Sequence, residues 1–253
     1  MDIDISATNH KGMRDLNQNR LLNFIRLNAP ISRPELSVAL ELSPATVLAL
    51  TNDLIERQIV VEKGTANSAR GRRPTLLDIH PEGGYAIGLM LREYETVGVV
   101  VNLHGAIVCS AHWDLTMPAD QDNVIEVIAA SVEELIAKAD IPRERLIGVG
   151  CALSGYIDSQ NGICIDSWQL GWHDFALAAP LGERLHLPVL IRNNVSCIAC
   201  YENLFGRGQA YEDFLTVAIG RGLGVGIVIN GDIYGGVTGG AGEFGHTAIV
   251  MDG

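Results

Sequence analysis

The chain has 253 residues, of which 47% are hydrophobic and 19% are charged, so it can bury a sizeable core and is neither disordered nor fibrous. Its net charge of −12 argues against indiscriminate binding to nucleic acid or anionic membranes, and it has no apolar run long enough for a membrane-spanning helix. Five scattered cysteines, and a start without a basic-then-apolar leader, favour a reduced protein of the cytoplasm.

The charge is divided unevenly along the chain. Residues 1–82 hold ten Lys or Arg and ten Asp or Glu, so the whole net charge of −12 belongs to residues 83–253. The segment Pro81-Glu82-Gly83-Gly84 marks the boundary between the two parts. We therefore expect two domains with different tasks, one over residues 1–82 and one over residues 83–253.

Three helices are predicted at the start of the chain. Residues 1–13 are polar and lack periodicity, which predicts a tail, whereas apolar residues at helical spacing begin after Arg14. Ser32-Arg33-Pro34-Glu35 is a capping box with its proline in the first turn, and it predicts the start of a second helix. Ser43-Pro44 predicts the start of a third helix, which ends near Gln58.

A hairpin follows these helices. Residues 59–63 and 74–79 are predicted strands, and the polar segment between them is a loop that carries arginines. Three short helices followed by a β-hairpin are the plan of a winged helix-turn-helix.

In the rest of the chain, the pattern of predicted strands and helices indicates an α/β domain with a mixed sheet. Helices are expected over residues 124–139 and 196–205. Strands are expected over residues 85–91, 96–101, 106–113, 146–153, 187–191, 214–219 and 224–230.

The third predicted helix offers a surface suited to DNA. Its apolar residues point to one side, and the opposite side presents Ala45, Thr46, Ala49 and Asn52. The N-terminal turn of such a helix, which here begins at Ser43, enters the major groove. Small side chains permit close approach, Thr46 can bond to base edges, and Asn52 can pair with adenine.

The loop of the predicted hairpin carries Arg70, Arg72 and Arg73 around a glycine. Arginines suit a narrow, electronegative minor groove, and glycine lets the backbone lie close to DNA. Together with the order of caps, turn and hairpin, this loop predicts operator DNA as a partner. The alternative is a helical interaction module with a solvated basic loop, since helix-turn-helix patterns alone often mislead.

Three glycine-rich motifs follow in the second domain. They are Gly220-Arg221-Gly222-Leu223-Gly224-Val225-Gly226, Asn230-Gly231 and Gly239-Gly240-Ala241-Gly242-Glu243-Phe244-Gly245-His246-Thr247. With these motifs and its winged helix, almost the whole chain resembles the repressor branch of the ROK family, which groups repressors, sugar kinases and unassigned open reading frames. The resemblance implies an actin-like (ribonuclease H-like) α/β fold over residues 83–253, with an incomplete C-terminal lobe.

Two departures from the family's kinases imply that the chain is not an enzyme. Those kinases hold ATP phosphate in an Asp-x-Gly-Gly-Thr loop, whereas residues 87–93 lack that aspartate and the loop glycines and end in Glu93. Those kinases also have Glu-Asn-Asp-Ala-Asn, with the aspartate as general base, where this chain has Arg192-Asn193-Asn194-Val195-Ser196. The amide of Asn194 cannot accept a proton from a sugar hydroxyl at neutral pH.

The positions that contact sugar in the family are better preserved. Asn193 and Asn194 can both donate and accept hydrogen bonds, Glu243 can accept from two hydroxyls, and His246 can reach the same ligand. The resemblance therefore implies a sugar-binding site at these four residues; the alternative is that Glu243 and His246 are solvated loop residues. Trp168 is a weaker candidate for stacking on a sugar ring, because aromatic side chains usually just pack.

The family also has a structural zinc site that includes the histidine equivalent to His246 and three cysteines of a Cys-x-Cys-Gly-x-x-Gly-Cys stretch. That stretch should begin just past Gly253, and none of the five cysteines has the required spacing. We therefore expect no required cofactor, with zinc at His246 only in a longer form. Cys197 and Cys200 lie one turn apart on a predicted helix, and we interpret them as core or inactive residues, with metal binding as the lesser alternative.

We expect a sequence-specific repressor of carbohydrate metabolism, a homodimer in the cytoplasm that binds operator DNA and a sugar effector and does not bind membranes. Two alternatives stay open. One is a ROK sugar kinase with an accessory DNA-binding domain. The other is a truncated module that binds DNA or dimerises without sensing an effector.

Overall fold

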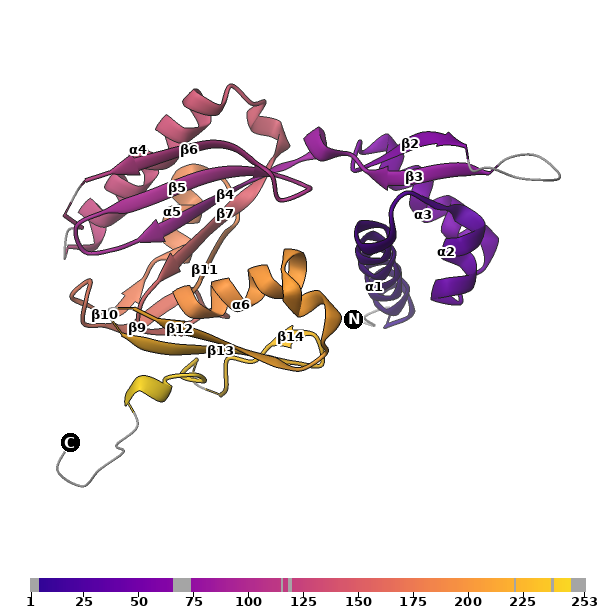
Figure 1. The fold of residues 1–253 in the computed structure, drawn as a ribbon. Coiled ribbons are helices and arrows are strands. Elements are labelled where there is room, and N and C mark those ends of the chain that lie inside the picture. Colours follow the sequence, from indigo (N-terminus) through magenta and orange to yellow (C-terminus); the bar gives the residue numbers. More distant parts are fainter. Residues whose placement is uncertain are drawn as a thin grey trace. The chain divides into compact units, whose positions relative to one another are not determined.

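The computed structural model describes residues 5–65, 74–114, 116–117, 120–220, 222–237 and 239–246. The chain divides into two compact units (Figure 1). The first comprises residues 1–84 with residues 102–106, and the second comprises residues 85–101 with residues 107–253.

The first unit has the helices and the hairpin of a winged helix-turn-helix, as predicted. Its helices are α1 (Ile5–Asn28), α2 (Arg33–Leu40) and α3 (Pro44–Glu56), and its strands are β1 (Ile31–Ser32), β2 (Val60–Thr65) and β3 (Thr75–Ile79). The strands form an antiparallel sheet in the order β1-β3-β2. The short strand β1, which pairs with β3 just before α2, was not expected.

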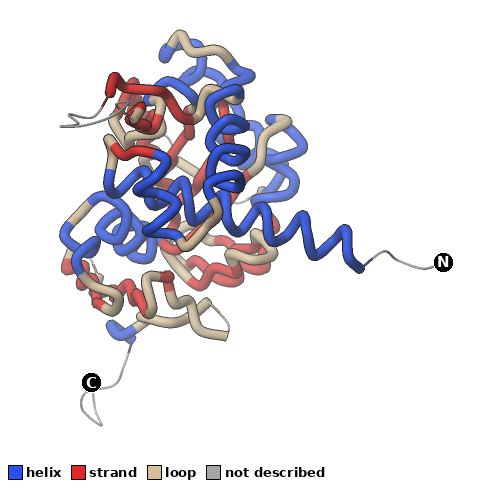
Figure 2. Tube along the Cα trace, turned by 90° about the vertical axis from the view of Figure 1, so that its right-hand side faces the viewer, coloured by secondary structure: helices blue, strands red, loops and turns tan. Residues whose placement is uncertain are grey.

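The tail expected over residues 1–13 is wrong for residues 5–13, which continue α1 toward the N-terminus (Figure 2). This extension is polar, so it lacks the apolar periodicity on which the expectation relied. A helix can form without an apolar stripe, because its backbone hydrogen bonds are internal.

Local capping explains where the two central helices begin. Ser32 caps α2, since its Oγ accepts from the Glu35 backbone N–H at 3.5 Å. In return, the Glu35 carboxylate accepts from the Ser32 backbone N–H at 2.9 Å and from its hydroxyl at 2.6 Å, which completes the capping box. Ser43 caps α3, since its Oγ accepts from the Thr46 backbone N–H at 3.1 Å, and Pro44 occupies the first helical position. Both predicted start signals are confirmed.

The two capped helices bury their apolar sides in one core. The largest fully buried side chains of this core lie on all three helices and on β3: Leu21, Ile25, Leu36, Leu54 and Leu77.

Among the described residues no single helix is long and apolar enough to cross a membrane. The bent pair α2–α3 qualifies only by length and composition.

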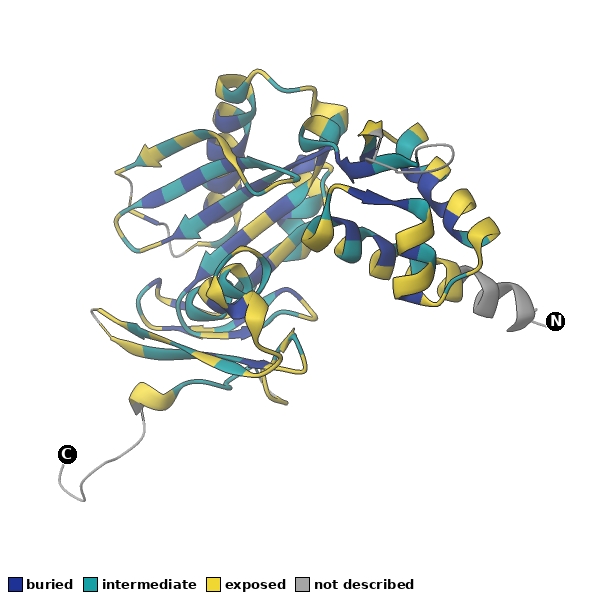
Figure 3. Cartoon of the chain, turned by 45° about the vertical axis from the view of Figure 1, so that its right-hand side comes forward, coloured by how far each residue is buried: buried dark blue, intermediate teal, exposed yellow. Residues whose placement is uncertain are grey.

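The second unit is built on a five-stranded sheet in the order β11-β7-β4-β5-β6. Its strands are β4 (Tyr85–Leu91), β5 (Thr96–Asn102), β6 (Ile107–Trp113), β7 (Leu146–Leu153) and β11 (Val189–Asn193). β11, β7 and β4 run parallel, and β5 and β6 form an antiparallel hairpin, so the sheet is mixed as expected. Buried and half-buried residues alternate along β4, as Figure 3 shows by colour.

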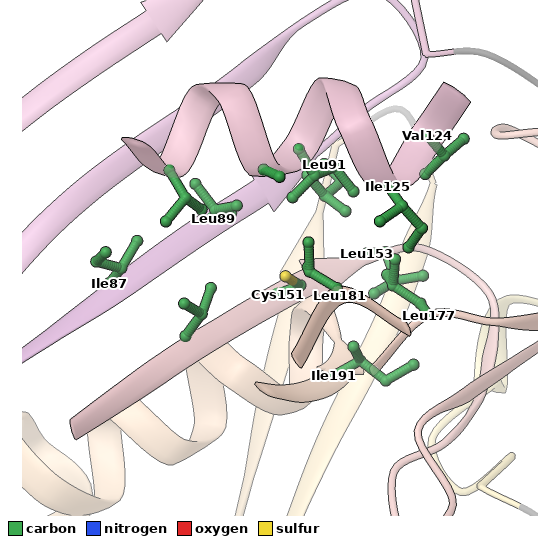
Figure 4. Close-up of a cluster of buried hydrophobic side chains, with 14 of the residues drawn as sticks. Ile87, Leu89, Leu91, Val124, Ile125, Cys151, Leu153, Leu177, Leu181 and Ile191 are labelled. Carbon is green, nitrogen blue, oxygen red and sulfur yellow. The ribbon is translucent and has the colours of Figure 1, made fainter. Parts of the chain in front are cut away.

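Two helices cover this sheet, α4 (Gln121–Ala139) and α5 (Ala178–Leu185). Figure 4 shows the core between them and the strands, where apolar side chains of β4, β7 and β11 meet those of α4 and α5. Only α4 was predicted. The equally short α2 was recognised by its capping box, whereas α5 begins without a capping side chain and was missed.

Two smaller sheets complete the second unit. One joins β8 (Tyr156–Asp158), β9 (Ile163–Ser167) and β10 (Trp172–Ala176), and the other joins β12 (Phe214–Ile219), β13 (Leu223–Ile229) and β14 (Asp232–Ile233). Helix α6 (Asn194–Phe205) packs on β12 and β13. Short 3-10 turns lie at Pro81–Gly83, Arg143–Arg145, Arg207–Ala210 and Phe244–His246.

Candidate functional site

The outer side of α3 is the candidate DNA-reading surface in the first unit. Ala45, Ala49 and Asn52 are exposed and Thr46 is half-buried, so these four residues, termed here the reading face, lie opposite the buried side of the helix. That buried side consists of Val47, Leu50, Thr51 and Leu54. The predicted division of α3 into two sides therefore holds.

Ser43 and Thr46 bond to each other as well as to the backbone. Their hydroxyl oxygens lie 2.8 Å apart, in addition to the capping bond between Ser43 Oγ and the Thr46 N–H. Both hydroxyls thus stabilise the start of α3, and each keeps further hydrogen-bonding capacity at the exposed N-terminal turn.

Arg33 also lies at this surface, although in the sequence it was notable only as part of the capping box. Its guanidinium donates to Thr51 Oγ1 at 2.9 Å, to Asn52 Oδ1 at 3.4 Å and to Glu62 Oε1 at 3.0 Å. The side chain thus joins the first residue of α2 to α3 and to β2. No sequence signal pointed to it, since its partners lie 18 to 29 residues away.

The three arginines proposed for the wing, Arg70, Arg72 and Arg73, lie outside the described residues. The strands that flank them are described, and at their base Lys63 Nζ lies 2.8 Å from Asp78 Oδ2. Asp78 is largely buried, and this ion pair links β2 to β3.

The second unit brings two of the candidate sugar-binding residues together at the ends of parallel strands. Asn193 is the last residue of β11, level with Leu153 at the end of β7. Its Nδ2 donates to the Gly155 carbonyl at 3.1 Å, and its Oδ1 accepts from the Val195 N–H at 2.9 Å, which caps α6. Asn194 begins α6, and its Oδ1 accepts from the same N–H at 2.9 Å.

Glycines bring Glu243 to Asn193 from a distant part of the sequence. A Cβ at Gly239 would collide with the Ile157 carbonyl of β8, and one at Gly242 would collide with the Val225 carbonyl of β13. Both glycines have positive φ, so this stretch lies closer to the two strands than any other residue type permits. As a result, Glu243 Oε1 lies 3.5 Å from Asn193 Nδ2, and both side chains are half-buried.

The remaining sugar-site candidates are placed less fully. His246 ends a 3-10 turn three residues after Glu243, but its side chain is outside the described part of the chain. Trp168 follows β9 and is 78% exposed, so it is not core packing. Trp172, four residues on, is the buried one and stacks on Phe175.

The side chains that the structure describes contain no group of three or more His, Cys, Asp or Glu that could hold a metal ion. Burial raises the pKa of Cys151 and of Cys164 to about 12 and that of Cys197 to about 11. Burial therefore keeps these three thiols protonated at neutral pH.

The turn after β4, where the resemblance placed the phosphate loop of the kinases, is closed by an ion pair. Arg92 Nη1 bonds to the Glu95 carboxylate, and the Arg92 N–H donates to the Glu95 carbonyl at 3.0 Å. The hydrogen bond from Arg92 lowers the pKa of Glu95 and so keeps it ionised. The Glu93 carbonyl accepts from the Met117 N–H at 2.9 Å, which fixes the same turn.

The fold and the site define a two-domain protein. It joins a winged helix-turn-helix to an α/β domain, and the α/β domain gathers amides and a carboxylate at its strand ends. The chain belongs to the ROK family, whose pattern matches residues 91–253. A second pattern, that of a winged helix-turn-helix DNA-binding domain, matches residues 14–61.

Regulators are among the most similar proteins. The xylose repressor of Caldicellulosiruptor bescii is 31% identical over 241 residues, which cover 95% of this chain and 60% of that protein. The DNA-binding transcriptional dual regulator NagC of Escherichia coli is 26% identical over 237 residues, which cover 94% of this chain and 58% of that protein.

Solved structures show the same relationship. The structure of a ROK family transcriptional regulator, a homologue of the E. coli Mlc protein, matches with a TM-score of 0.83 and 27% identity, over 95% of this chain and 61% of that one. A ROK family glucokinase from Streptomyces griseus, in complex with glucose and AMPPNP, matches with a TM-score of 0.59 and 28% identity, over 67% and 52%. The chain spans about 60% of the length of the regulators it matches.

Proposed function

We propose that this chain is a sequence-specific DNA-binding regulator of carbohydrate metabolism, a repressor, that responds to a sugar or sugar derivative. Residues 1–82 bind the operator and residues 83–253 bind the effector. The observation that carries the proposal is the exposed reading face of α3, which presents small and amide side chains in the same chain as a ROK domain.

Operator recognition follows from the chemistry of the first domain. The N-terminal turn of α3, from Ser43, enters the major groove, where Thr46 and Asn52 bond to base edges and the two alanines permit close approach. Arg70, Arg72 and Arg73 contact the minor groove and its phosphates. The partner is thus a defined DNA sequence, despite the net charge of −12.

Effector recognition follows from the donors and acceptors at the strand ends. Asn193, Asn194, Glu243 and His246 together offer amide donors, amide acceptors and a carboxylate, which complement adjacent hydroxyls of a sugar. Two relatives are named for xylose and for N-acetylglucosamine, so these two sugars head the panel of candidate effectors.

Regulation is a shift in population between two states of a homodimer in the cytoplasm. Sugar binding favours the state with lower affinity for the operator, because only differential affinity for the two states can move their equilibrium. The regulator needs no cofactor for this step. No membrane takes part.

A sugar kinase is the second candidate, and the 28% identity to the S. griseus glucokinase favours it. The amide of Asn194 and the closed, acidic turn after β4 argue against it, since neither a general base nor a phosphate loop is supplied. We therefore propose that the chain is not an enzyme.

The test is selection of preferred sites from a random DNA library, followed by fluorescence anisotropy. We expect one enriched sequence, bound far more tightly than unrelated DNA. Ala49→Glu places a charge on the reading face and should abolish this preference, whereas Leu16→Glu, at an exposed position of α1, should not. Equal binding of both variants, or no enriched sequence, contradicts the proposal.

A further inference from the structure

Arg33 ties together three elements at the edge of the reading face. It is the first residue of α2, and its side chain is only 22% exposed because it lies along α3 and β2. Nε donates to Thr51 Oγ1 at 2.9 Å, while Nη2 donates to Asn52 Oδ1 at 3.4 Å and to Glu62 Oε1 at 3.0 Å. Of these partners, only Asn52 belongs to the reading face.

Hydrogen bonds to Thr51 and Glu62 fix the orientation of the planar, forked Arg33 guanidinium. Thr51 is fully buried and its hydroxyl donates to the Leu48 carbonyl at 3.2 Å, so its oxygen is free to accept from Arg33. Glu62 holds the other end of the fork and offsets its charge. A lysine ammonium is a point charge and cannot span these anchors with fixed geometry.

The consequence falls on the Asn52 amide. Arg33 occupies one lone pair of Asn52 Oδ1, which turns the Nδ2 group of the same amide away from Arg33. The second lone pair of Oδ1 stays available. An exposed asparagine otherwise samples several orientations, and holding it in one removes part of the ordering cost of binding.

We propose that Arg33 is a positioning residue for base reading: it holds the Asn52 amide so that Nδ2 donates to an acceptor on a base edge, with Oδ1 left to accept in a bidentate pair with adenine. This inference rests on the proposed DNA-binding function. It assigns Arg33 a role through Asn52, distinct from a direct contact to phosphate.

The two roles differ in what a lysine can replace. A phosphate contact needs only positive charge, so Arg33→Lys would preserve it. Loss of a phosphate contact would weaken binding to all DNA sequences alike. It would also lower the slope of log affinity against log salt concentration by about 0.9. A positioning role needs the fork. Arg33→Lys and Arg33→Ala should then lose discrimination equally at one base pair, with the salt slope unchanged.

The experiment measures anisotropy on the selected site and on its single-base variants for wild type, Arg33→Lys and Arg33→Ala. Arg57→Lys and Arg57→Ala are matched controls, since Arg57 is an exposed arginine that follows α3 and bonds to Asp53. We expect both Arg33 variants to lose about tenfold in discrimination at one position, and the Arg57 variants to lose none. Wild-type discrimination in Arg33→Lys, or a uniform loss across sequences, overturns the inference.

Two further measurements separate this inference from folding and from the proposed function. In an Asn52→Ala background, Arg33→Lys should cause no further loss of discrimination between bases, because Arg33 acts through Asn52. If the losses from the two substitutions add, the inference is overturned. Without DNA, the side-chain amide NMR signals of Asn52 should shift in Arg33→Lys and stay in place in Arg57→Lys. If selection enriches no sequence, the proposed function fails, and the amide signals still decide whether Arg33 holds Asn52.

Discussion

Asn193 Nδ2 lies 3.5 Å from Glu243 Oε1, although fifty residues separate the two side chains in the sequence. Asn193 is held by its capping role at α6, and Glu243 is held by a stretch whose glycines lie against the backbones of β8 and β13. Neither position depends on a ligand. The pair is therefore a preformed group of donor and acceptor atoms at the strand ends of the second unit.

Gly242→Ala should weaken sugar binding although it leaves every candidate contact residue in place. The added Cβ would collide with the Val225 carbonyl at a φ of 88°, so the stretch must move and carry Glu243 away from Asn193. Loss of one hydrogen bond to a charged group should lower affinity about tenfold or more by calorimetry.

Gly235→Ala is the matched control, because a Cβ there meets no atom within 4 Å. It should bind sugar normally, and both variants should bind DNA normally. Normal sugar affinity in Gly242→Ala would show that the glycine stretch does not place Glu243.

Replacing Arg70, Arg72 and Arg73 together by alanine should weaken binding to every DNA sequence, by about 1 kcal/mol per lost contact at low salt. The plot of log affinity against log salt should flatten by about 0.9 per lost phosphate contact. Arg184→Ala removes an exposed arginine of α5 and should change neither quantity. If the triple variant behaves like Arg184→Ala in anisotropy, the wing assignment is wrong.

The chain should transfer no phosphate from Mg-ATP to glucose, mannose, xylose or N-acetylglucosamine. Asn194→Asp restores a carboxylate but should also stay inactive, because Arg92 and Glu95 still close the turn after β4. A coupled assay and mass spectrometry would detect product. Turnover at the ~1–100 per second typical of kinases, in either protein, would establish an enzyme.

Glu35 should stabilise the fold at neutral pH and cease to do so in acid. Hydrogen bonds from the Ser32 side chain and backbone lower its pKa, so the folded state favours the ionised carboxylate. Its contribution is therefore present above the ordinary pKa of about 4.3 and is lost as pH falls through the depressed folded value.

Urea unfolding of Glu35→Gln measures this contribution. The variant should be less stable than wild type near neutral pH, and the difference should shrink as the pH falls below the ordinary glutamate pKa and through the lowered pKa of folded Glu35. Glu56→Gln removes an exposed carboxylate at the end of α3 and is the control for general charge effects. A difference for Glu35→Gln that does not change with pH would refute the capping-box account.

Local signals account for what was predicted of the fold. Ser32 with Glu35, and Ser43 with Pro44, mark helix starts through contacts three residues apart, which a sequence displays directly. The sheet β8-β9-β10, whose strands have three to five residues, was not predicted. It is held by cross-strand neighbours such as Cys164 and Phe175.

The candidate sites divide in the same way. The exposed side of α3 follows from helical periodicity, so Ala45, Ala49 and Asn52 could be placed from the sequence. The hydrogen bonds of Arg33 to Thr51 and Asn52, and of Asn193 to Glu243, are tertiary contacts between elements that no local pattern links. Motif resemblance pointed to Asn193 and Glu243 as sugar contacts, but not to the bond between them.

The coupling between operator and sugar tests the central claim most directly. Calorimetry should measure the Kd of each sugar in the panel, and of its phosphate, with and without the selected operator. For the true effector we predict a change in Kd of about 5- to 150-fold when operator is present, and an equal change in operator affinity when sugar is present. Identical isotherms in both conditions, for a sugar that does bind, would contradict the account and leave a DNA-binding protein whose sugar site does not regulate it.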